Sequence, residues 1–265
     1  MSETDLTITP ESVTLTFLGT GTSHGIPQLR CGCRVCRSTD PADTRRRSSA
    51  LVSVGGKNLL IDCGPDFREQ MLRVGSPDID AVLLTHEHYD HTGGLDDLRL
   101  YSPEEGTLPV YCRSDVARHL HERLPYCFGH IDYPGVPRLS TEIIGDEPFM
   151  AAGIQVTPLP VMHGKLPITG FLIGNMAYVT DCKTMPESTA GLIRDNAATL
   201  VINALRHKEH PMHMNLTEAL HVIEVTAPEK AYLTHICHEL GLQKELDTTL
   251  PEGIRAATDF LCIRT

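Results

Sequence analysis

The sequence of 265 residues has no long apolar run, no excess of basic residues and no internal repeat. Because a membrane-spanning helix needs about 20 mainly apolar residues, we expect no membrane span. Lys and Arg number 23 against 34 Asp and Glu, and the net charge of −11 argues against a general affinity for nucleic acid or anionic lipid. Bound metal ions can still supply positive charge locally, so a nucleic-acid partner is disfavoured without being excluded.

A secretory signal is also missing, since Met1–Pro10 is polar and acidic and lacks a basic-then-apolar pattern. We therefore expect a cytoplasmic protein, in which nine cysteines are free thiols or metal ligands in preference to disulfides. Fourteen histidines are present, and many of them cluster in short stretches. This distribution is the first indication of metal binding.

The hydrophobic pattern predicts strands interleaved with helices, which indicates a layered α/β domain over residues 1–265. A hairpin is expected to turn at Gly55-Gly56, and Asn215 with Glu218 has the spacing of a capping box. Residues 125–148 show little periodicity and are expected as surface loop. The predicted strands are 13–19, 49–54, 58–61, 81–84, 108–112, 155–158, 169–173, 176–180, 200–203 and 231–233, and the predicted helices are 65–74, 94–101, 115–124, 186–196 and 216–225.

The sharpest motif, Thr85-His86-Glu87-His88-Tyr89-Asp90-His91, comes directly after the apolar run 81–84. A spacing of two places His86 and His88 on one side of an extended segment. Four ligand-type side chains within six residues can begin two metal sites. The alternative, a solvated polar loop, does not explain why three histidines and an aspartate gather after an apolar strand.

This motif resembles the HxHxDH signature of the metallo-β-lactamase superfamily, and the other superfamily elements follow in the same order over residues 13–263. The resemblance implies an αββα sandwich with a two-metal site at one edge of the packed sheets. It implies that one ion is held by His86, His88 and His163, that the other is held by Asp90, His91 and His235, that Asp181 bridges both, and that Asp62 orients the motif loop without being a ligand.

True β-lactamases place a cysteine ligand near Asp181-Cys182, but the aligned residue here is the aspartate. Cys182 is then expected as a packed neighbour. This difference favours a phosphoesterase-like or glyoxalase-like site over a β-lactam hydrolase.

Cys31, Cys33 and Cys36 form a CxCxxC cluster in a loop, and three thiolates need a fourth ligand to close a tetrahedral zinc site. His238, three residues after His235, is the candidate, and a set of free thiols is the alternative. Together with Gly19–Pro27, this pattern closely resembles the phosphoribosyl cyclic phosphodiesterases of the carbon–phosphorus lyase pathway. The resemblance implies a structural zinc on these four residues, which pins an inserted loop at about 20–48 beside the active site.

A basic run, Arg45-Arg46-Arg47, is interpreted either as a phosphate-recognition element or as a solvated run with internal salt bridges. Further along, His213 matches the non-ligand catalytic histidine of the resembling family. We expect it to be a general acid with a pKa near neutrality. His207 and His210 are expected as surface histidines, and Arg206 is left unassigned.

These observations together predict a metal-dependent phosphodiesterase acting on a small cyclic phosphate of a sugar or nucleotide. Hydroxide activated by two divalent ions, zinc or manganese with iron as a further candidate, would attack phosphorus. His213 and Asp90 are the candidate catalytic residues, and one structural zinc is expected in addition. The alternatives are a tRNA 3′-processing endonuclease, a thioester or lactone hydrolase, and a non-catalytic metal-binding domain, and a homodimer stays open.

Overall fold

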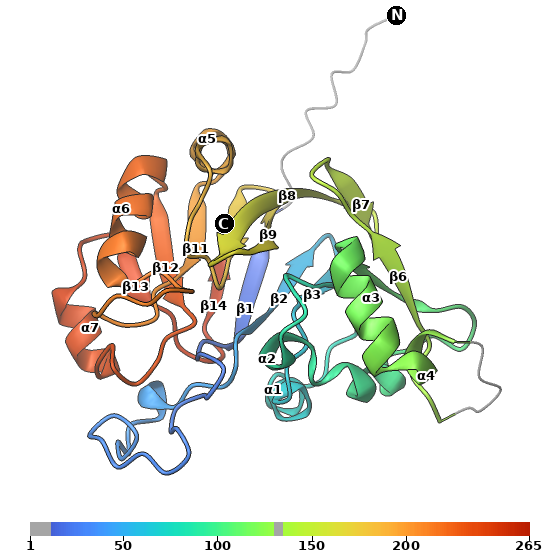
Figure 1. Ribbon diagram of the computed structural model, residues 1–265, viewed down its shortest axis with the longest axis horizontal. Coiled ribbons are helices and arrows are strands. Elements are labelled where there is room, and N and C mark those ends of the chain that lie inside the picture. The colour runs from blue at the N-terminus through green and yellow to red at the C-terminus, as the bar shows by residue number, and fades with distance from the viewer. Residues whose placement is uncertain (1–11, 130–134) are drawn as a thin grey trace, which may run out of the picture.

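The computed structural model describes residues 12–129 and 135–265, and its strands form two mixed sheets (Figure 1). The strand orders are β14-β1-β2-β3-β4-β5-β6 and β13-β12-β11-β10-β9-β8-β7. The first sheet consists of β1 (Thr14–Gly19), β2 (Ser49–Val54), β3 (Lys57–Ile61), β4 (Ala81–Leu83), β5 (Leu108–Cys112), β6 (Leu139–Ile143) and β14 (Cys262–Arg264). The second consists of β7 (Phe149–Ala151), β8 (Ile154–His163), β9 (Leu166–Ile173), β10 (Met176–Val179), β11 (Thr199–Asn203), β12 (Lys230–Thr234) and β13 (Ile254–Ala256).

Helices cover the outer face of each sheet (Figure 1). Those of the first half are η1 (Pro41–Asp43), α1 (Phe67–Arg73), α2 (Tyr89–Thr92), η2 (Leu95–Leu100), α3 (Ser114–Arg123) and α4 (Pro125–Phe128), where η denotes a 3₁₀ helix. Those of the second half are α5 (Glu187–Asn196), α6 (Leu216–Thr226) and α7 (Gln243–Thr249). None of the described helices is long and apolar enough to cross a membrane.

The alternation of side chains along the strands explains the layers. In β3, Leu59 and Ile61 join the core between the sheets, whereas Leu60 packs on the opposite side, beneath α1 and α3. Tyr178 of β10 fills the same inter-sheet core from the facing sheet. On the outer side of the second sheet, Ile193 of α5 packs in a third apolar cluster. The resulting order of layers is helix, sheet, sheet, helix, which confirms the αββα sandwich.

Two local predictions are confirmed. The hairpin of β2 and β3 turns at Gly55 and Gly56, whose φ angles of 56° and 79° are those a two-residue hairpin turn requires. Asn215 accepts from the backbone N–H of Glu218, whose side chain accepts from Asn215 N, so the capping box that begins α6 is complete.

Other predictions of secondary structure are confirmed only in part. The helix predicted at 94–101 is the 3₁₀ helix η2, which begins after Gly94. The loop predicted at 125–148 contains α4 and the strand β6, because Leu139 is buried and pairs with Leu108 of β5. Residues 130–134 of that segment, and the Met1–Pro10 segment on which the signal argument depends, lie outside the described residues.

The arrangement of the parallel strands determines where the site forms. In the first sheet the pairs β3–β4, β4–β5 and β5–β6 are parallel, and in the second β10–β11, β11–β12 and β12–β13 are parallel. The carboxyl ends of neighbouring parallel strands meet at one edge of a sheet, which is where ligand sites of α/β proteins form. Most of the predicted site residues follow these ends.

Candidate metal centre

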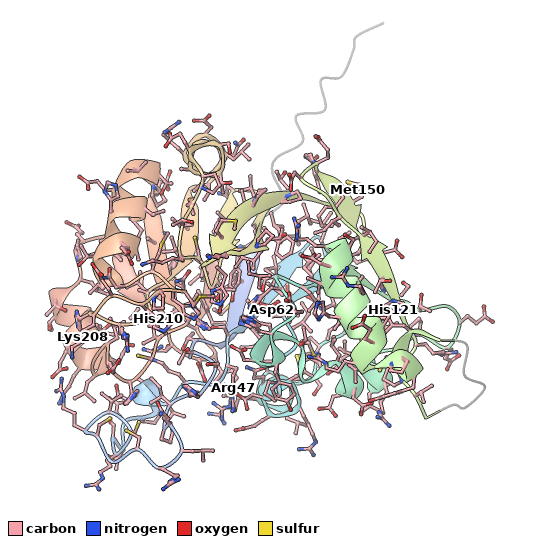
Figure 2. The ribbon with its side chains drawn as sticks, viewed as in Figure 1. Arg47, Asp62, His121, Met150, Lys208 and His210 are labelled. Atoms are coloured by element: carbon pink, nitrogen blue, oxygen red, sulfur yellow. The ribbon has the colours of Figure 1, made fainter. Side chains whose placement is uncertain are left out.

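Three of the predicted site residues have unusual backbone conformations at the ends of strands. Asp62 follows β3, Asp181 lies two residues beyond β10, and His235 follows β12. Their φ angles are 60°, 55° and 53°, in the left-handed region that residues other than glycine rarely adopt. Such strain persists where the surrounding structure fixes it, and it is concentrated at functional sites. In Figure 2, Asp62 and His210 lie lower in the view than Met150, which lies toward the top.

Asp62 supports the motif loop as predicted. Its carboxylate accepts hydrogen bonds from the backbone N–H and the hydroxyl of Thr85, each at 2.9 Å, and lies 2.7 Å from His91 Nδ1. Burial raises the pKa of Asp62, while its partners His91 and Thr85 act in the opposite direction. The carboxylate therefore fixes the His91 ring so that Nε2 faces the centre of the site.

Asp181 lies between two groups of histidines. Its Oδ1 is 3.3 Å from His91 Nε2 and 3.2 Å from His235 Nδ1. Its Oδ2 is 3.6 Å from His213 Nδ1 and 3.9 Å from His86 Nε2. A carboxylate whose two oxygens face different imidazoles has the geometry of a bridge between two cations.

The first group contains every residue predicted for one metal ion. Ligand-type atoms of Asp90, His91, Asp181 and His235 all lie within 4.8 Å of one another. Among the described residues, the buried atoms His91 Nε2 and His235 Nδ1 have no hydrogen-bond partner. Buried polar atoms are rarely left unpaired, and two imidazole nitrogens with two carboxylates suit a divalent ion. The donor set therefore fits a metal.

The second group differs in part from the prediction. His163 and Asp181 lie within 4.8 Å of His213, which was expected not to be a ligand. His86 and His88 lie beside this group, with ring centroids 5.6 Å and 5.2 Å from that of His163. However, His86 Nε2 points to His88 Nδ1 at 3.0 Å. The structure thus groups His213 with His163 and Asp181, and it places His86 and His88 beside them.

The charges of the cluster favour a cation. Burial lowers the pKa of His91, but the carboxylates of Asp181, Asp90 and Asp62 outweigh burial and raise this pKa well above its usual value. Burial raises the pKa of Asp181, but His235 and His91 reverse the shift and hold it low. Three carboxylates around one imidazole favour positive charge at that position. A bound cation would supply this charge in place of the proton on His91.

His213 has an environment that the sequence did not reveal. Burial lowers its pKa to about 3, because the ring has left water and is also close to His235 and His163. This value is below the near-neutral pKa expected from the sequence. Its Nδ1 is a further buried atom without a hydrogen-bond partner in the described part of the chain.

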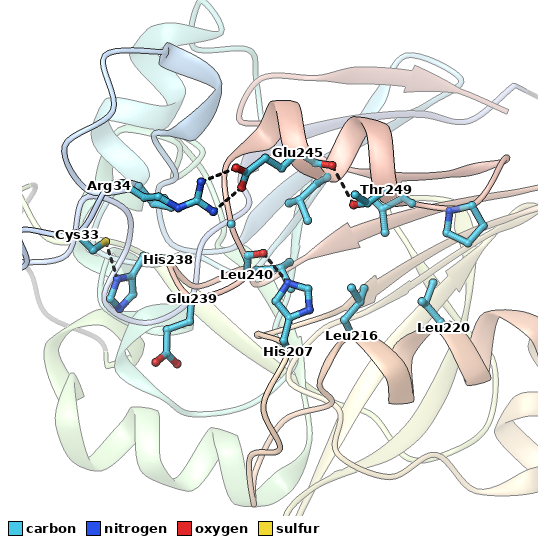
Figure 3. Close-up of a pocket in the computed structure, with 15 residues that line it drawn as sticks. Cys33, Arg34, His207, Leu216, Leu220, His238, Glu239, Leu240, Glu245 and Thr249 are labelled. Carbon is cyan, nitrogen blue, oxygen red and sulfur yellow. Dashed lines mark hydrogen bonds and ion pairs between the residues drawn. The ribbon is translucent and has the colours of Figure 1, made fainter.

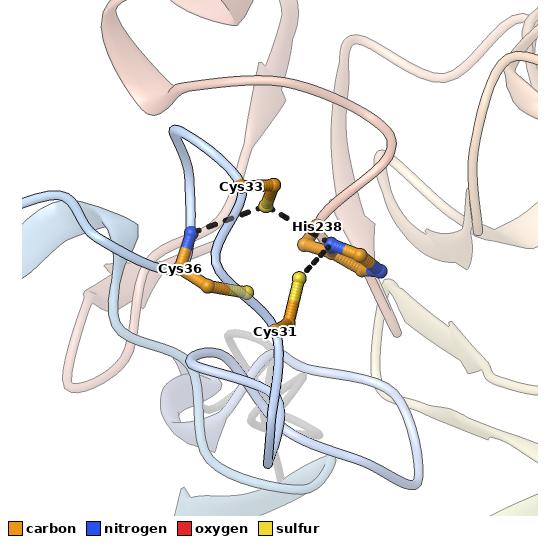
Figure 4. Close-up of side chains that lie close together, drawn as sticks. All are labelled: Cys31, Cys33, Cys36 and His238. Atoms are coloured by element: carbon orange, nitrogen blue, oxygen red, sulfur yellow. Dashed lines mark hydrogen bonds between the residues drawn. The ribbon is translucent and has the colours of Figure 1, made fainter.

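The cysteine cluster forms as predicted (Figure 4). Ligand-type atoms of Cys31, Cys33, Cys36 and His238 all lie within 4.8 Å of one another. The Nδ1 atom of His238 is 3.2 Å from Cys33 Sγ and 3.4 Å from Cys31 Sγ. Burial raises the pKa of the Cys33 thiol, but the Cys36 N–H and His238 outweigh burial and lower it to about 6. Three sulfurs and one imidazole nitrogen are a donor set typical of structural zinc.

Hydrogen bonds connect the cysteine loop with the active-site loop. Thr22, a residue that sequence reasoning missed, has its hydroxyl 3.3 Å from His235 Nε2. Its backbone N–H donates to Ile236 O at 3.1 Å, and Ile236 N donates to Thr20 O at 2.9 Å. The only signal for this contact in the sequence is the Gly19–Pro27 motif that begins the loop. His235 is thereby fixed from the side opposite Asp181.

The arginine run is engaged within the protein. Arg45 is buried and donates to Thr20 Oγ1 at 2.7 Å and to Gln243 Oε1 at 2.5 Å. Arg46 forms an ion pair with Glu69, and Arg47 forms one with Asp66. These contacts favour the internal salt-bridge interpretation over phosphate recognition.

Two cavities flank the cysteine cluster. The larger, of 810 Å³, lies between the cysteine loop, α6 and α7, and neither Asp90 nor Asp181 lines it. In its wall, Arg34 pairs with Glu245, and His207 Nε2 lies 2.9 Å from Leu240 O (Figure 3). The smaller, of 330 Å³, includes His213 in its wall. Its lining is Thr22, Ser23, His24, Gln28, Leu205, Arg206, His210, His213, Cys237, His238 and Glu239.

Comparison with known proteins agrees with this geometry. Residues 57–236 match the family model described as a beta-lactamase superfamily domain. A solved diphosphatase of the PhnP family is 38% identical, superposes with a TM-score of 0.90, and is covered to 97% by 96% of this chain. Zinc-bound PqqB from Methylobacterium extorquens shares the fold at 20% identity, with a TM-score of 0.74 and coverage of 94% of this chain and 99% of that one.

A relative by sequence carries a different name. An octanoyltransferase of Porphyromonas gingivalis is 44% identical over 248 residues, which are 92% of this chain and 50% of that protein. The chain thus spans half the length of this relative.

Proposed function

The chain belongs to the metallo-β-lactamase superfamily and is a hydrolase, and from this premise we propose that it cleaves phosphodiester bonds with two divalent ions. The observation that carries the proposal is the position of Asp181. One of its oxygens faces His91 and His235, and the other faces His213 and His86. This arrangement supports two adjacent cations, which suit a substrate with several charged oxygens.

The residues proposed to hold the ions are those of the two groups around Asp181. When bound, such ions neutralise phosphate oxygens and favour the ionisation of water near neutral pH. One position is assigned to Asp90, His91, His235 and Asp181, and the other to His163, His86, His88 and Asp181, with His213 beside it as a proton donor and not as a ligand.

The remaining residues act on the substrate and on the ligands. His213 lines the smaller cavity, so its ring can contact the leaving oxygen of a bound ester. A phosphate anion beside the ring would favour its charged form and raise the low pKa, which prepares the ring to donate a proton. Asp62 and Thr22 hold His91 and His235 at the nitrogens that face away from Asp181.

The substrate class follows from the charge of the protein and the size of the smaller cavity. The net charge of −11 and the internal ion pairs of Arg46 and Arg47 disfavour tRNA as the substrate. A small cyclic phosphate of a sugar or nucleotide is therefore the leading substrate. A diphosphate diester is the second candidate, favoured by the 38% identity to a PhnP-family diphosphatase.

A substrate screen at defined metal content tests the proposal. Protein loaded with zinc or manganese is assayed on a five-membered cyclic ribose phosphate, a linear diester, a diphosphate diester, a thioester, a lactone and a precursor tRNA. We expect turnover of the small phosphate substrates and its loss after chelation. Preference for the thioester or lactone would identify an acyl hydrolase, cleavage of the tRNA an endonuclease, and no turnover a binding domain.

A further inference from the structure

Asn203, the last residue of β11, uses both polar atoms of its side-chain amide to bond the backbone of Cys182. It is fully buried, and its Oδ1 accepts from the backbone N–H of Cys182 at 2.7 Å. Its Nδ2 donates to the backbone carbonyl of the same Cys182 at 2.9 Å. The orientation of the amide is fixed by chemistry, because only the oxygen can accept from N–H and only the nitrogen can donate to the carbonyl.

Cys182 connects two candidate site residues through its backbone. It directly follows Asp181, whose φ is 55°. Its carbonyl also accepts from Met214 N at 2.8 Å, and Met214 directly follows His213. The Cys182 carbonyl therefore receives two donors, one from Asn203 and one from the segment that carries His213.

The two segments are tied together a second time just beyond this point. Lys183 Nζ donates to Glu218 Oε1 at 2.6 Å, and Glu218 belongs to the capping box that begins α6. Leu205 N donates to Met214 O at 3.0 Å, which joins the end of β11 to the same segment. The separation of Asp181 and His213 is thus set by side-chain and backbone hydrogen bonds that converge on Cys182 and its neighbours.

We propose that Asn203 is a positioning residue, which holds the strained Asp181 and His213 at the separation that the site needs. A residue with left-handed φ keeps its conformation only where neighbouring contacts over-determine it, and the two bonds from Asn203 do so one residue after Asp181. A role in folding alone would require only that the buried amide be satisfied. Because Asn203 and Met214 both donate to the Cys182 carbonyl, the Asn203 amide helps to position the segment that carries His213. The inference rests on the proposed function only in treating Asp181 as a ligand.

The informative substitution is Asn203→Asp, which keeps the shape of the side chain and the acceptor for Cys182 N. An ionised carboxylate cannot donate to the Cys182 carbonyl, so the bond from Asn203 Nδ2 is lost, whereas the bond from Met214 N to the same carbonyl remains. We expect the affinity for the active-site ions to fall by about 10–100-fold, the range for residues that orient ligands, while the zinc content of the cysteine cluster is unchanged. At saturating metal, kcat should fall more than KM rises.

Asn58→Asp is the matched control. The Asn58 amide also accepts one hydrogen bond, from Ser53 Oγ at 2.6 Å, and donates one to a backbone carbonyl, that of Asp78, at 2.8 Å. It lies near the amino end of β3, whereas Asp62 follows the carboxyl end, so it should lower the melting temperature without changing the affinity for the active-site ions. Asn203→Thr, which suits a strand end and keeps one acceptor, provides a second variant if Asn203→Asp does not fold.

A double-mutant cycle separates positioning from general destabilisation. In a His213→Ala background, Asn203→Asp should reduce kcat by a smaller factor than in the wild-type background, because one of the two positioned groups is already gone. The metal-affinity measurement needs no substrate, so it tests the role of Asn203 even if the chain hydrolyses no phosphodiester. Unchanged metal affinity and kcat in Asn203→Asp, or an equal loss of metal affinity in Asn58→Asp, would overturn the proposal.

Discussion

At the scale of single residues, the two oxygens of Asp181 define two positions in the site. The Asp181→Asn substitution keeps the shape of the side chain but removes the negative charge that two cations would share. We expect hydrolysis to fall on the order of 10³-fold or more, because positioned charge supplies much of the transition-state stabilisation. The measurement is kcat/KM at saturating metal, with active-site ion content determined in parallel. Near-normal activity would move the bridging role elsewhere, and Cys182 would be the first alternative.

His213 requires an experiment that separates proton donation from metal binding, since its Nδ1 lies 3.6 Å from Asp181 Oδ2. If His213 is a general acid, the His213→Ala variant should keep its full metal content and lose roughly 10²–10⁴-fold in rate on a diester with a poor leaving group. With a p-nitrophenolate leaving group the loss should be much smaller, since that anion needs no proton. Equal losses on both substrates would indicate substrate positioning, and loss of metal would make His213 a ligand.

The sequence indicated which residues would gather better than it indicated their hydrogen bonds. Asp90, His91, Asp181 and His235 come together as their motifs indicated. The positions of Thr22 and Asn203 could not be predicted, because each contacts a segment that is distant or lies on a neighbouring strand. Motif spacing reports ligand chemistry within one loop, whereas hydrogen bonds between strand ends depend on sheet order.

At the scale of elements, the close approach of the β3 end to α2 depends on glycine. A Cβ atom on Gly64 would lie 2.1 Å from Asp90 O, a contact that real side chains do not make. Gly64→Ala should therefore displace the loop that carries Asp90 and His91, and destabilise the fold by roughly 1–3 kcal/mol. Denaturant unfolding and active-site metal content check this.

Gly145→Ala is the control for Gly64→Ala, because a Cβ at Gly145 has no described atom within 4 Å. It should leave both the stability and the metal content unchanged. If Gly64→Ala matched it in both respects, the tight packing between the β3 end and α2 would not be needed for the site.

Elements with a strong local pattern were predictable, and short edge elements were not. The central strands alternate between two cores, and α6 carries a complete capping box. The strands β7, β13 and β14 have three residues each and lie at or next to the edges of their sheets. Three residues are too few to show a period, so these strands form because a neighbouring strand offers hydrogen bonds.

At the scale of the whole molecule, the site draws its residues from both halves of the sandwich. His86 and His91 come from the first half, and His163, Asp181 and His235 from the second. A backbone hydrogen bond from Thr169 N to Thr85 O, at 3.1 Å, joins the halves next to the motif. Ions bound here would therefore stabilise the packing of one sheet against the other.

The metal content of the chain is the prediction at this scale. Elemental analysis should find about three ions per chain, two in the active site and one zinc on the cysteine cluster. Cys33→Ser should lose the zinc and lower the melting temperature before it affects the intrinsic active-site ligands. Unchanged zinc content and melting temperature in this variant would refute the structural zinc site.

The loop after β12 carries His235 for the active site and His238 for the cysteine cluster, with only Ile236 and Cys237 between them. Occupancy of either site orders the same short segment, so the two sites are thermodynamically linked. Linkage is reciprocal: the factor by which zinc strengthens the binding of the active-site ions equals the factor by which those ions strengthen the binding of zinc. Metal loading of this chain should then be cooperative, and titration of the active-site ions with and without zinc on the cysteine cluster should give different affinities.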